Sequence, residues 1–266
     1  MRYRPLLLLC LSIAFRSHAA LQVFPIRIHL SDSKRVAQVS LRHSGSKPTE
    51  YKITSVFYRM KPDGSMEVVS DPKPEERSAI PMIRFSPRQT VVPPKEEQIV
   101  RVMLDKVKDI PDGEYRAHLH FEPTSESEDS QVSVSKSEKV SLRLEARMAV
   151  AVPVIFRHGK PTFEVKLSDF QLIQMPDKKP GFSLRMASDG NAFPFGDFEV
   201  FLQPKSGGDE KQIGVVRGVA SYLPQRKVAY PLTSDEKLDP GTVRVEFKGP
   251  QEDGGKVLAT AQKAIP

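Results

Sequence analysis

Runs in which apolar and polar residues alternate recur along this chain. In the longest run, 140–156, every even-numbered residue is apolar: Val140, Leu142, Leu144, Ala146, Met148, Val150, Val152, Val154 and Phe156. A period of two places such residues on one face of a β-strand. We therefore predict one strand over 140–156, which is longer than the roughly 3 to 10 residues of most strands.

Shorter alternating runs predict further strands at 36–41, 51–58, 99–104, 115–121, 163–167, 198–202 and 242–247. Turn signals separate these runs, at 62–64, 111–113, 180–181 and 239–241, each with Pro or Gly. Sustained helical periodicity is almost absent, and the 23 prolines suit loops and edge strands. Short strands separated by such turns predict an all-β protein built of sandwiches.

The sequence also suggests where the chain divides. The long alternating run stops near Arg157, and Gly159 and Pro161 precede a new strand. We predict two domains, 21–158 and 159–266. The polar, serine-rich segment 123–139 predicts a mobile loop just before the long strand.

The first twenty residues are typical of a secretory signal peptide. The chain begins MRYR, continues with a short apolar run from Pro5 to Phe15, and then offers small residues for cleavage near Ala19. This apolar run is too short to span a bilayer, so we expect an exported protein without membrane insertion. The only cysteine, Cys10, lies in the signal, which excludes thiolate metal sites and cysteine nucleophiles from the mature chain.

Charge and motifs argue against nucleic-acid binding and catalysis. The formal charge of +7 falls to +4 when Arg2, Arg4 and Arg16 leave with the signal, and the remaining charges are mixed. The motifs GxSxG, HExxH, GxxxxGK[ST] and GxGxxG are all absent. We expect no nucleic-acid partner, no cofactor and no enzymatic activity.

One segment, EYRAHLHFE, leaves a metal-binding alternative open. His118 and His120 lie on the same side of a predicted strand, and Glu122 follows on that side. Two imidazoles and a carboxylate could bind a cation, although local spacing fixes no third ligand. An exported metal-binding or ligand-binding module is therefore the alternative function.

The long strand has an unusual second face. Positions 141, 143, 145 and 147 are Ser, Arg, Glu and Arg, whereas 149–155 read Ala, Ala, Pro and Ile at the odd positions. The strand thus runs from an amphipathic part into a part that is apolar on both faces. Proteins normally protect apolar edge strands, so an unprotected one favours pairing with a partner.

Several segments together resemble the periplasmic chaperones that assemble pili and fimbriae through the chaperone-usher pathway. They are LQVFPIRIHL near the start, IRFSPRQTVVPPKEEQIVRVML, DGEYRAHLHFEP, VPVIFRHGKP and the late LDPGTVRVEF. The resemblance covers essentially the whole mature chain. It implies two immunoglobulin-like β-sandwich domains set at an angle, in a periplasmic protein that works without ATP or a cofactor.

The resemblance also implies the site. The chaperone would donate residues 140–150 as a missing strand to a pilus or fimbrial subunit, with Val140, Leu142, Leu144, Ala146, Met148 and Val150 filling successive pockets. Arg27 would bind the terminal carboxylate of the subunit. The family's second cation, a lysine, is replaced here by Pro153. Arg27 would then act alone or with Arg147 or Lys160.

A second group of residues matches an interdomain network of ion pairs in that family. Its members here are Glu114, Arg157 and Asp239, which would fix the angle between the domains. The expected partners are the subunits and an outer-membrane usher that receives them. The donor edge could also allow self-association of the free protein.

Overall fold

The computed structural model describes residues 21–105, 107, 109–124, 131–135, 141–145, 148–233 and 238–266, with the backbone alone at 131–135 and 141–145. The predicted signal peptide, Val140, Ala146 and Arg147 lie outside these ranges. The described chain is built of β-strands with short 3-10 turns, so the all-β prediction is confirmed. None of its helices has the length and apolarity needed to cross a bilayer.

The N-terminal half forms two facing sheets. One has the order β1 (Leu21–Phe24), β3 (Val36–His43), β8 (Glu97–Leu104) and β6 (Ile83–Ser86). The other has the order β2 (Ile28–Ser31), β12 (Val150–His158), β9 (Gly113–Pro123), β4 (Thr49–Met60) and β5 (Met66–Val69), with β7 (Gln89–Val92) paired to β4. Alternate residues of both sheets meet in one core that includes Leu41, Val100, Leu119 and Val154.

The C-terminal half forms a second sandwich. One of its sheets has the order β13 (Phe163–Gln174), β14 (Pro180–Gly190) and β17 (Gln225–Pro231). The other has the order β16 (Lys211–Ala220), β15 (Phe195–Pro204), β18 (Gly241–Lys248) and β19 (Val257–Ile265). In β18 every second residue is buried, as its alternating sequence predicts. The rings of Phe182, Phe198 and Phe247 pack together in this core.

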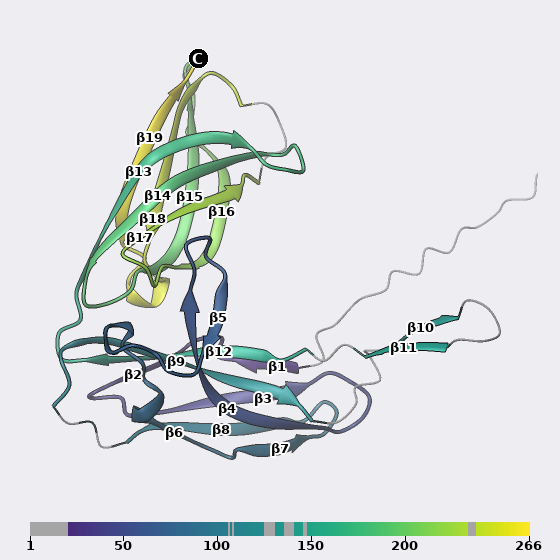
Figure 1. Ribbon diagram of the computed structural model, residues 1–266. Helices are drawn as coiled ribbons and strands as arrows, with labels where there is room; N and C mark the ends of the chain where they lie inside the picture. The colour runs from purple at the N-terminus through teal and green to yellow at the C-terminus, as the bar shows by residue number, and fades with distance from the viewer. Residues whose placement is uncertain are drawn as a thin grey trace, which may run out of the picture.

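The two sandwiches are set at an angle, as Figure 1 shows. The sheet that contains β9 and β12 faces the C-terminal sandwich, and the β4–β5 hairpin rises beside it. The short 3-10 helix η1 (Pro74–Glu76) follows this hairpin, and η2 (Ile80–Met82) leads into β6. A further 3-10 helix, η4 (Gln251–Asp253), follows β18 in the C-terminal sandwich.

The start of the described chain belongs to both sheets of the first sandwich. Residues of β1 pair antiparallel with β3, whereas β2 pairs in parallel with β12 in the opposite sheet. The chain therefore crosses from one sheet to the other between Phe24 and Ile28. Because β2 begins only at Ile28, its pairing with β12 starts at Val154.

Three expectations from the sequence are wrong in detail. The run 140–156 is not one strand, because β11 (Ser141–Glu145) pairs with β10 (Gln131–Ser135) as a separate hairpin, and β12 begins only at Val150. The strand β10 lies in 123–139, which we expected to be a loop. The predicted turn at 180–181 is instead the start of β14, because these residues pair with β13.

Candidate partner-binding site

Strand β12 has a half-open edge. Residues Val154 to Arg157 pair with β2 on one side, and all of β12 from Val150 to His158 pairs with β9 on the other. Within the described ranges, no strand pairs with 150–153 on the side away from β9. Backbone groups on that side can accept an added strand. Pro153 fits an edge rather than a central ladder because it has no N–H, so an added strand would receive no hydrogen bond from this residue.

The six residues predicted to be donated lie in four different situations. Met148, immediately before β12, is 80% exposed. Val150 instead packs partly buried against the core of its own sandwich. Leu142 and Leu144 lie in β11, opposite Val134 and Val132 in the backbone register. The remaining two, at 140 and 146, are outside the described residues.

Arg27 lies where the two sandwiches meet. It directly precedes β2, and its guanidinium carbon is 4.0 Å from the centroid of the Phe195 ring, which belongs to β15 of the other sandwich. The Nε of Arg27 is buried and has no hydrogen-bond partner among the described residues. A guanidinium in contact with an aromatic face can still offer N–H groups at its edge to a carboxylate.

Arg27 lies in one row across the sheet with Pro153 and His118. Because Val154 pairs with Ile28, Pro153 lies beside Arg27, and it pairs on its other side with His118 of β9. His118 is buried, and its Nδ1 has no partner among the described residues. Burial, reinforced by the nearby positive charges of Arg116 and Arg27, lowers the pKa of His118 to about 3. The row therefore contains one permanent cation and one neutral imidazole.

The predicted pairing of Glu114 with Arg157 is present. Arg157 Nε donates to Glu114 Oε2 at 3.1 Å, and Glu114 is completely buried. The carboxylate also accepts a hydrogen bond from the backbone N–H of Phe193 in the other sandwich. Burial nevertheless raises the pKa of Glu114, against the opposing effect of Arg157 and Arg27.

The prediction of Asp239 as the third member of this network is wrong. Asp239 is exposed just before β18, at the end of that strand opposite η4. The acid that Arg157 meets from the C-terminal sandwich is Asp253 of η4, with Nη1 3.6 Å from Oδ2. Motif matching predicted Asp239, whereas the acid found beside Arg157 is Asp253, whose position depends on how the two sandwiches dock.

Arg147 and Lys160 were the predicted alternatives for a second cation, and no contact of either with Arg27 is found among the described residues. Arg147 lies outside the described residues. Lys160 is exposed in the segment between β12 and β13, where its backbone N–H donates to Asp112 Oδ2 at 3.1 Å. Pro153 therefore has no described cationic substitute.

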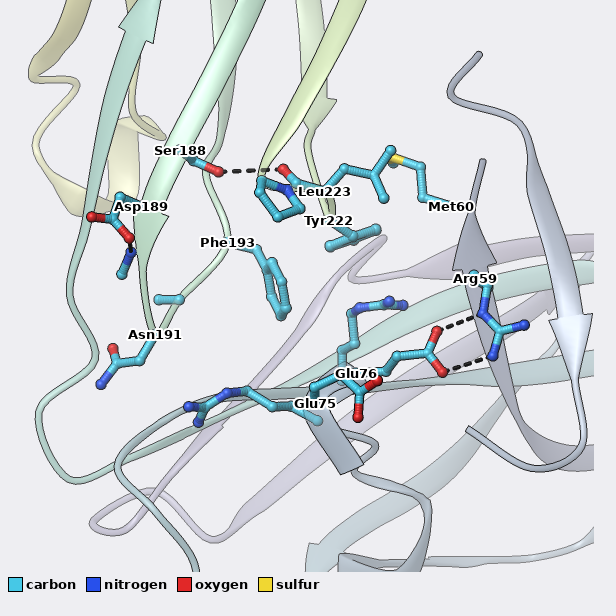
Figure 2. A pocket seen from close by; sticks show the side chains of 15 residues that line it. Arg59, Met60, Glu75, Glu76, Ser188, Asp189, Asn191, Phe193, Tyr222 and Leu223 are labelled. Atoms are coloured by element: carbon cyan, nitrogen blue, oxygen red, sulfur yellow. Dashed lines mark hydrogen bonds and ion pairs between the residues drawn. The ribbon is translucent and has the colours of Figure 1, made fainter. Parts of the chain in front are cut away.

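A cavity of about 390 Å³ lies between the sandwiches on the side of β4, and Figure 2 shows it. Arg59 and Glu76 from the first sandwich line it opposite Phe193 and Tyr222 from the second. Arg59 donates two hydrogen bonds to the Glu76 carboxylate, of 2.6 and 2.8 Å. These bonds lower the pKa of Glu76 to about 2. The cavity wall thus carries a fixed ion pair.

The metal-binding alternative finds no support in the described side chains. They contain no group of three or more His, Asp or Glu residues that could hold a metal ion. His118 is buried and packs edge-on against Tyr58, with 4.9 Å between the ring centroids. His120, two residues further along β9, is partly exposed.

Sequence reasoning missed the aromatic residues that the second sandwich contributes. Phe193, Phe195 and Tyr222 all contact charged side chains of the first sandwich. The available signal was the row Glu114, Arg116 and His118, where polar residues alternate with core residues. Such a row normally faces solvent, but here all three residues are buried, and Arg116 and Glu114 contact the second sandwich through Tyr222 and Phe193.

No protein-family model and no curated protein sequence matches this chain. Solved structures of fimbrial chaperones are similar to it over almost its whole length. A crystal structure of the YadV chaperone covers 93% of this chain and 100% of its own, with 11% identity and a TM-score of 0.46. A structure of the Salmonella enterica SafA pilin in complex with the SafB chaperone covers 94% of this chain and 98% of its own, with 10% identity and a TM-score of 0.46. The CupB2 chaperone from Pseudomonas aeruginosa covers 92% of this chain and 100% of its own, with 15% identity and a TM-score of 0.42.

Proposed function

We propose that this protein is a periplasmic chaperone that binds an exported pilus or fimbrial subunit by adding a strand to it. The observation that carries the proposal is the half-open edge of β12, which is unpaired from Val150 to Pro153 on the side away from β9. A strand added there would form main-chain hydrogen bonds irrespective of its own sequence, with Pro153 able to offer only its carbonyl oxygen. Alternating apolar side chains just before β12 would supply specificity.

Residues 140–148 are the proposed donor segment, with Leu142, Leu144 and Met148 as the main apolar contacts. Met148 is 80% exposed and is free to enter a partner's core. Val150 is the proposed inner limit of the segment, because its side chain already packs against its own core. Each well-buried aliphatic side chain would contribute about 1.5 to 3 kcal/mol before ordering costs.

Arg27 is the proposed anchor for the carboxylate at the end of the subunit. Its guanidinium is held over Phe195 and its Nε lacks a described partner. Beside it, Pro153 carries no charge and His118 is neutral because its pKa is about 3. The anchor is therefore a single-cation site, weaker than a pair of cations would be.

The proposal extends to the organisation of the chain and its route. We assign 21–158 and 159–266 as the two domains, because one core draws on residues between Leu21 and Phe156 and the other on residues between Phe170 and Phe247. Residues 1–19 are the proposed signal peptide. Delivery of the bound subunit to an outer-membrane usher, without catalysis, completes the proposed cycle.

The test is to purify the tagged protein from a native periplasm and identify by mass spectrometry what is bound to it. We expect a stoichiometric exported subunit, which Leu144→Arg should remove. The matched control is Val68→Arg, at a residue that is 59% exposed on β5. A partner that survives Leu144→Arg, or the absence of any partner when fibre genes are expressed, contradicts the proposal.

A further inference from the structure

Arg116 occupies an unusual environment between the two sandwiches. It lies on β9, is only 2% exposed, and its guanidinium is surrounded by three aromatic rings. The guanidinium carbon is 4.3 Å from the ring centroid of Phe57, which belongs to the same sandwich. It is 4.2 Å from Tyr222 and 5.5 Å from Phe193, which both belong to the other sandwich.

Few polar groups compensate the charge of Arg116. Its Nη1 donates to the backbone carbonyl of Tyr58 at 2.5 Å, and its Nε is buried with no partner in the described part of the chain. The two nearest acids are engaged elsewhere, Glu76 with Arg59 and Glu114 with Arg157. Burial accordingly lowers the pKa of Arg116 to about 10. The aromatic faces, together with the charges of Glu76 and Glu114 at longer range, stabilise this cation.

The backbone around Arg116 is held firmly in the first sandwich. Its N–H donates to the carbonyl of Arg77 at 3.0 Å, and its carbonyl accepts from the N–H of Ala79 at 2.8 Å. The rings of Phe193 and Tyr222 come from the loops before β15 and β17. The contact therefore joins a fixed strand of one sandwich to two loops of the other.

We propose that Arg116 is a positioning residue that fixes the second sandwich on the first through Tyr222 and Phe193. Phe193 is two residues from Phe195, whose ring covers Arg27. A displacement of this loop would move both rings together. Arg116 thereby also holds Phe195 over the anchor, and this last step rests on the proposed function.

The first test measures geometry alone. Spin labels at Glu97→Cys and Lys211→Cys, two exposed residues in different sandwiches, report the distance between them in the mature protein, whose sequence otherwise has no cysteine. Tyr222→Ala and Arg116→Lys should broaden this distance distribution, since lysine keeps the charge but not the planar guanidinium. Tyr222→Phe keeps the ring and should match the wild type. An unchanged distribution in Tyr222→Ala, or in a folded Arg116→Lys, would overturn the proposal.

Two further measurements make these outcomes decisive. Circular dichroism must show that each variant keeps its β-sheet content, and Tyr222→Ala, at a loop, serves if Arg116→Lys does not fold. An NMR titration with a short acetylated peptide that has a free C-terminal carboxylate measures the anchor. Tyr222→Ala should weaken this binding about fivefold or more. A broadened distribution with unchanged peptide affinity would keep the positioning role of Arg116 and overturn its link to the anchor.

Discussion

The guanidinium of Arg27 lies over the ring of Phe195, 4.0 Å from its centroid, although the two residues belong to different sandwiches. In the described row of Arg27, Pro153 and His118, the one cation is thus positioned by the second sandwich as well as by the first. The proposed carboxylate anchor would therefore depend on both halves of the chain.

Replacing Arg27 by alanine should abolish the preference for a carboxylate. We expect wild-type protein to bind a short acetylated peptide more tightly as the free acid than as the amide, by about 1.5 to 3 kcal/mol, because a hydrogen bond to a charged group is lost in the amide. In Arg27→Ala the two peptides should bind equally. NMR titration measures both affinities.

Arg88 provides the matched control, since its guanidinium carbon also lies over a ring, 5.7 Å from the centroid of Phe85, but in the first sandwich alone. The preference should survive in Arg88→Ala. Equal loss in both variants would mean that general positive charge, rather than Arg27, selects the carboxylate.

Introducing lysine at position 153 should strengthen the anchor. Pro153 lies beside Arg27 in the strand register, so Pro153→Lys would place a second cation at the carboxylate. We expect a gain of about 1 kcal/mol, or roughly fivefold in affinity, after allowing for repulsion between the two cations. Isothermal titration with the same free-acid peptide measures it, and Pro153→Gln controls for loss of the proline. A gain of equal size in both variants would argue against a charge effect.

His118 should make the protein less stable in mild acid. Its folded-state pKa of about 3 lies below the ordinary value of 6.5, so the unfolded chain takes up a proton that the folded chain does not. This contribution is present above about pH 6.5 and is lost as pH falls, by about 1.4 kcal/mol per pH unit, towards pH 3. Urea unfolding between pH 7 and pH 5 measures the slope.

The variant His118→Gln should flatten this slope. His120→Gln, two residues along the same strand, controls for the loss of an imidazole and should retain it. If wild type and His118→Gln respond identically to pH, His118 does not remain neutral in the folded protein.

Replacing Glu114 by glutamine should cost little stability near neutral pH. Burial raises the pKa of Glu114, so its ionisation destabilises the folded state increasingly as pH rises above the unfolded-state pKa near 4.5, and the full effect is reached above the raised folded-state pKa. Glutamine keeps a hydrogen-bond acceptor for Phe193 and Arg157 without the charge. We expect a free energy of unfolding at pH 7 within about 1 kcal/mol of the wild type, or higher. Loss of several kcal/mol would show that the buried ion pair is strongly stabilising.

Local alternation was sufficient to predict many strands but not their partners. The run 140–156 has one uninterrupted period, yet its first part pairs with β10 and its second with β9 and β2. A period of two fixes which face is apolar and says nothing about where pairing changes. The sequence therefore located the apolar face and missed the break at the start of β12.

The site shows the same division between local and long-range information. Glu114 and Arg157 pair across neighbouring strands of one sheet, and motif matching predicted both. Asp253, Phe195 and Tyr222 reach the first sandwich only because of how the second one docks. No spacing within the sequence reports that docking, which is why Asp239 was predicted in place of Asp253.

The crossover between β1 and β2 determines more than the path of the chain. Ile28 and Leu30 of β2 point into the core, so a shift of its pairing with β12 by one residue would expose both and turn His29 towards the core. The same shift would change how many residues of β12 remain unpaired. The register of this one short strand therefore determines both the length of the open edge and the side on which the charge of Arg27 enters it.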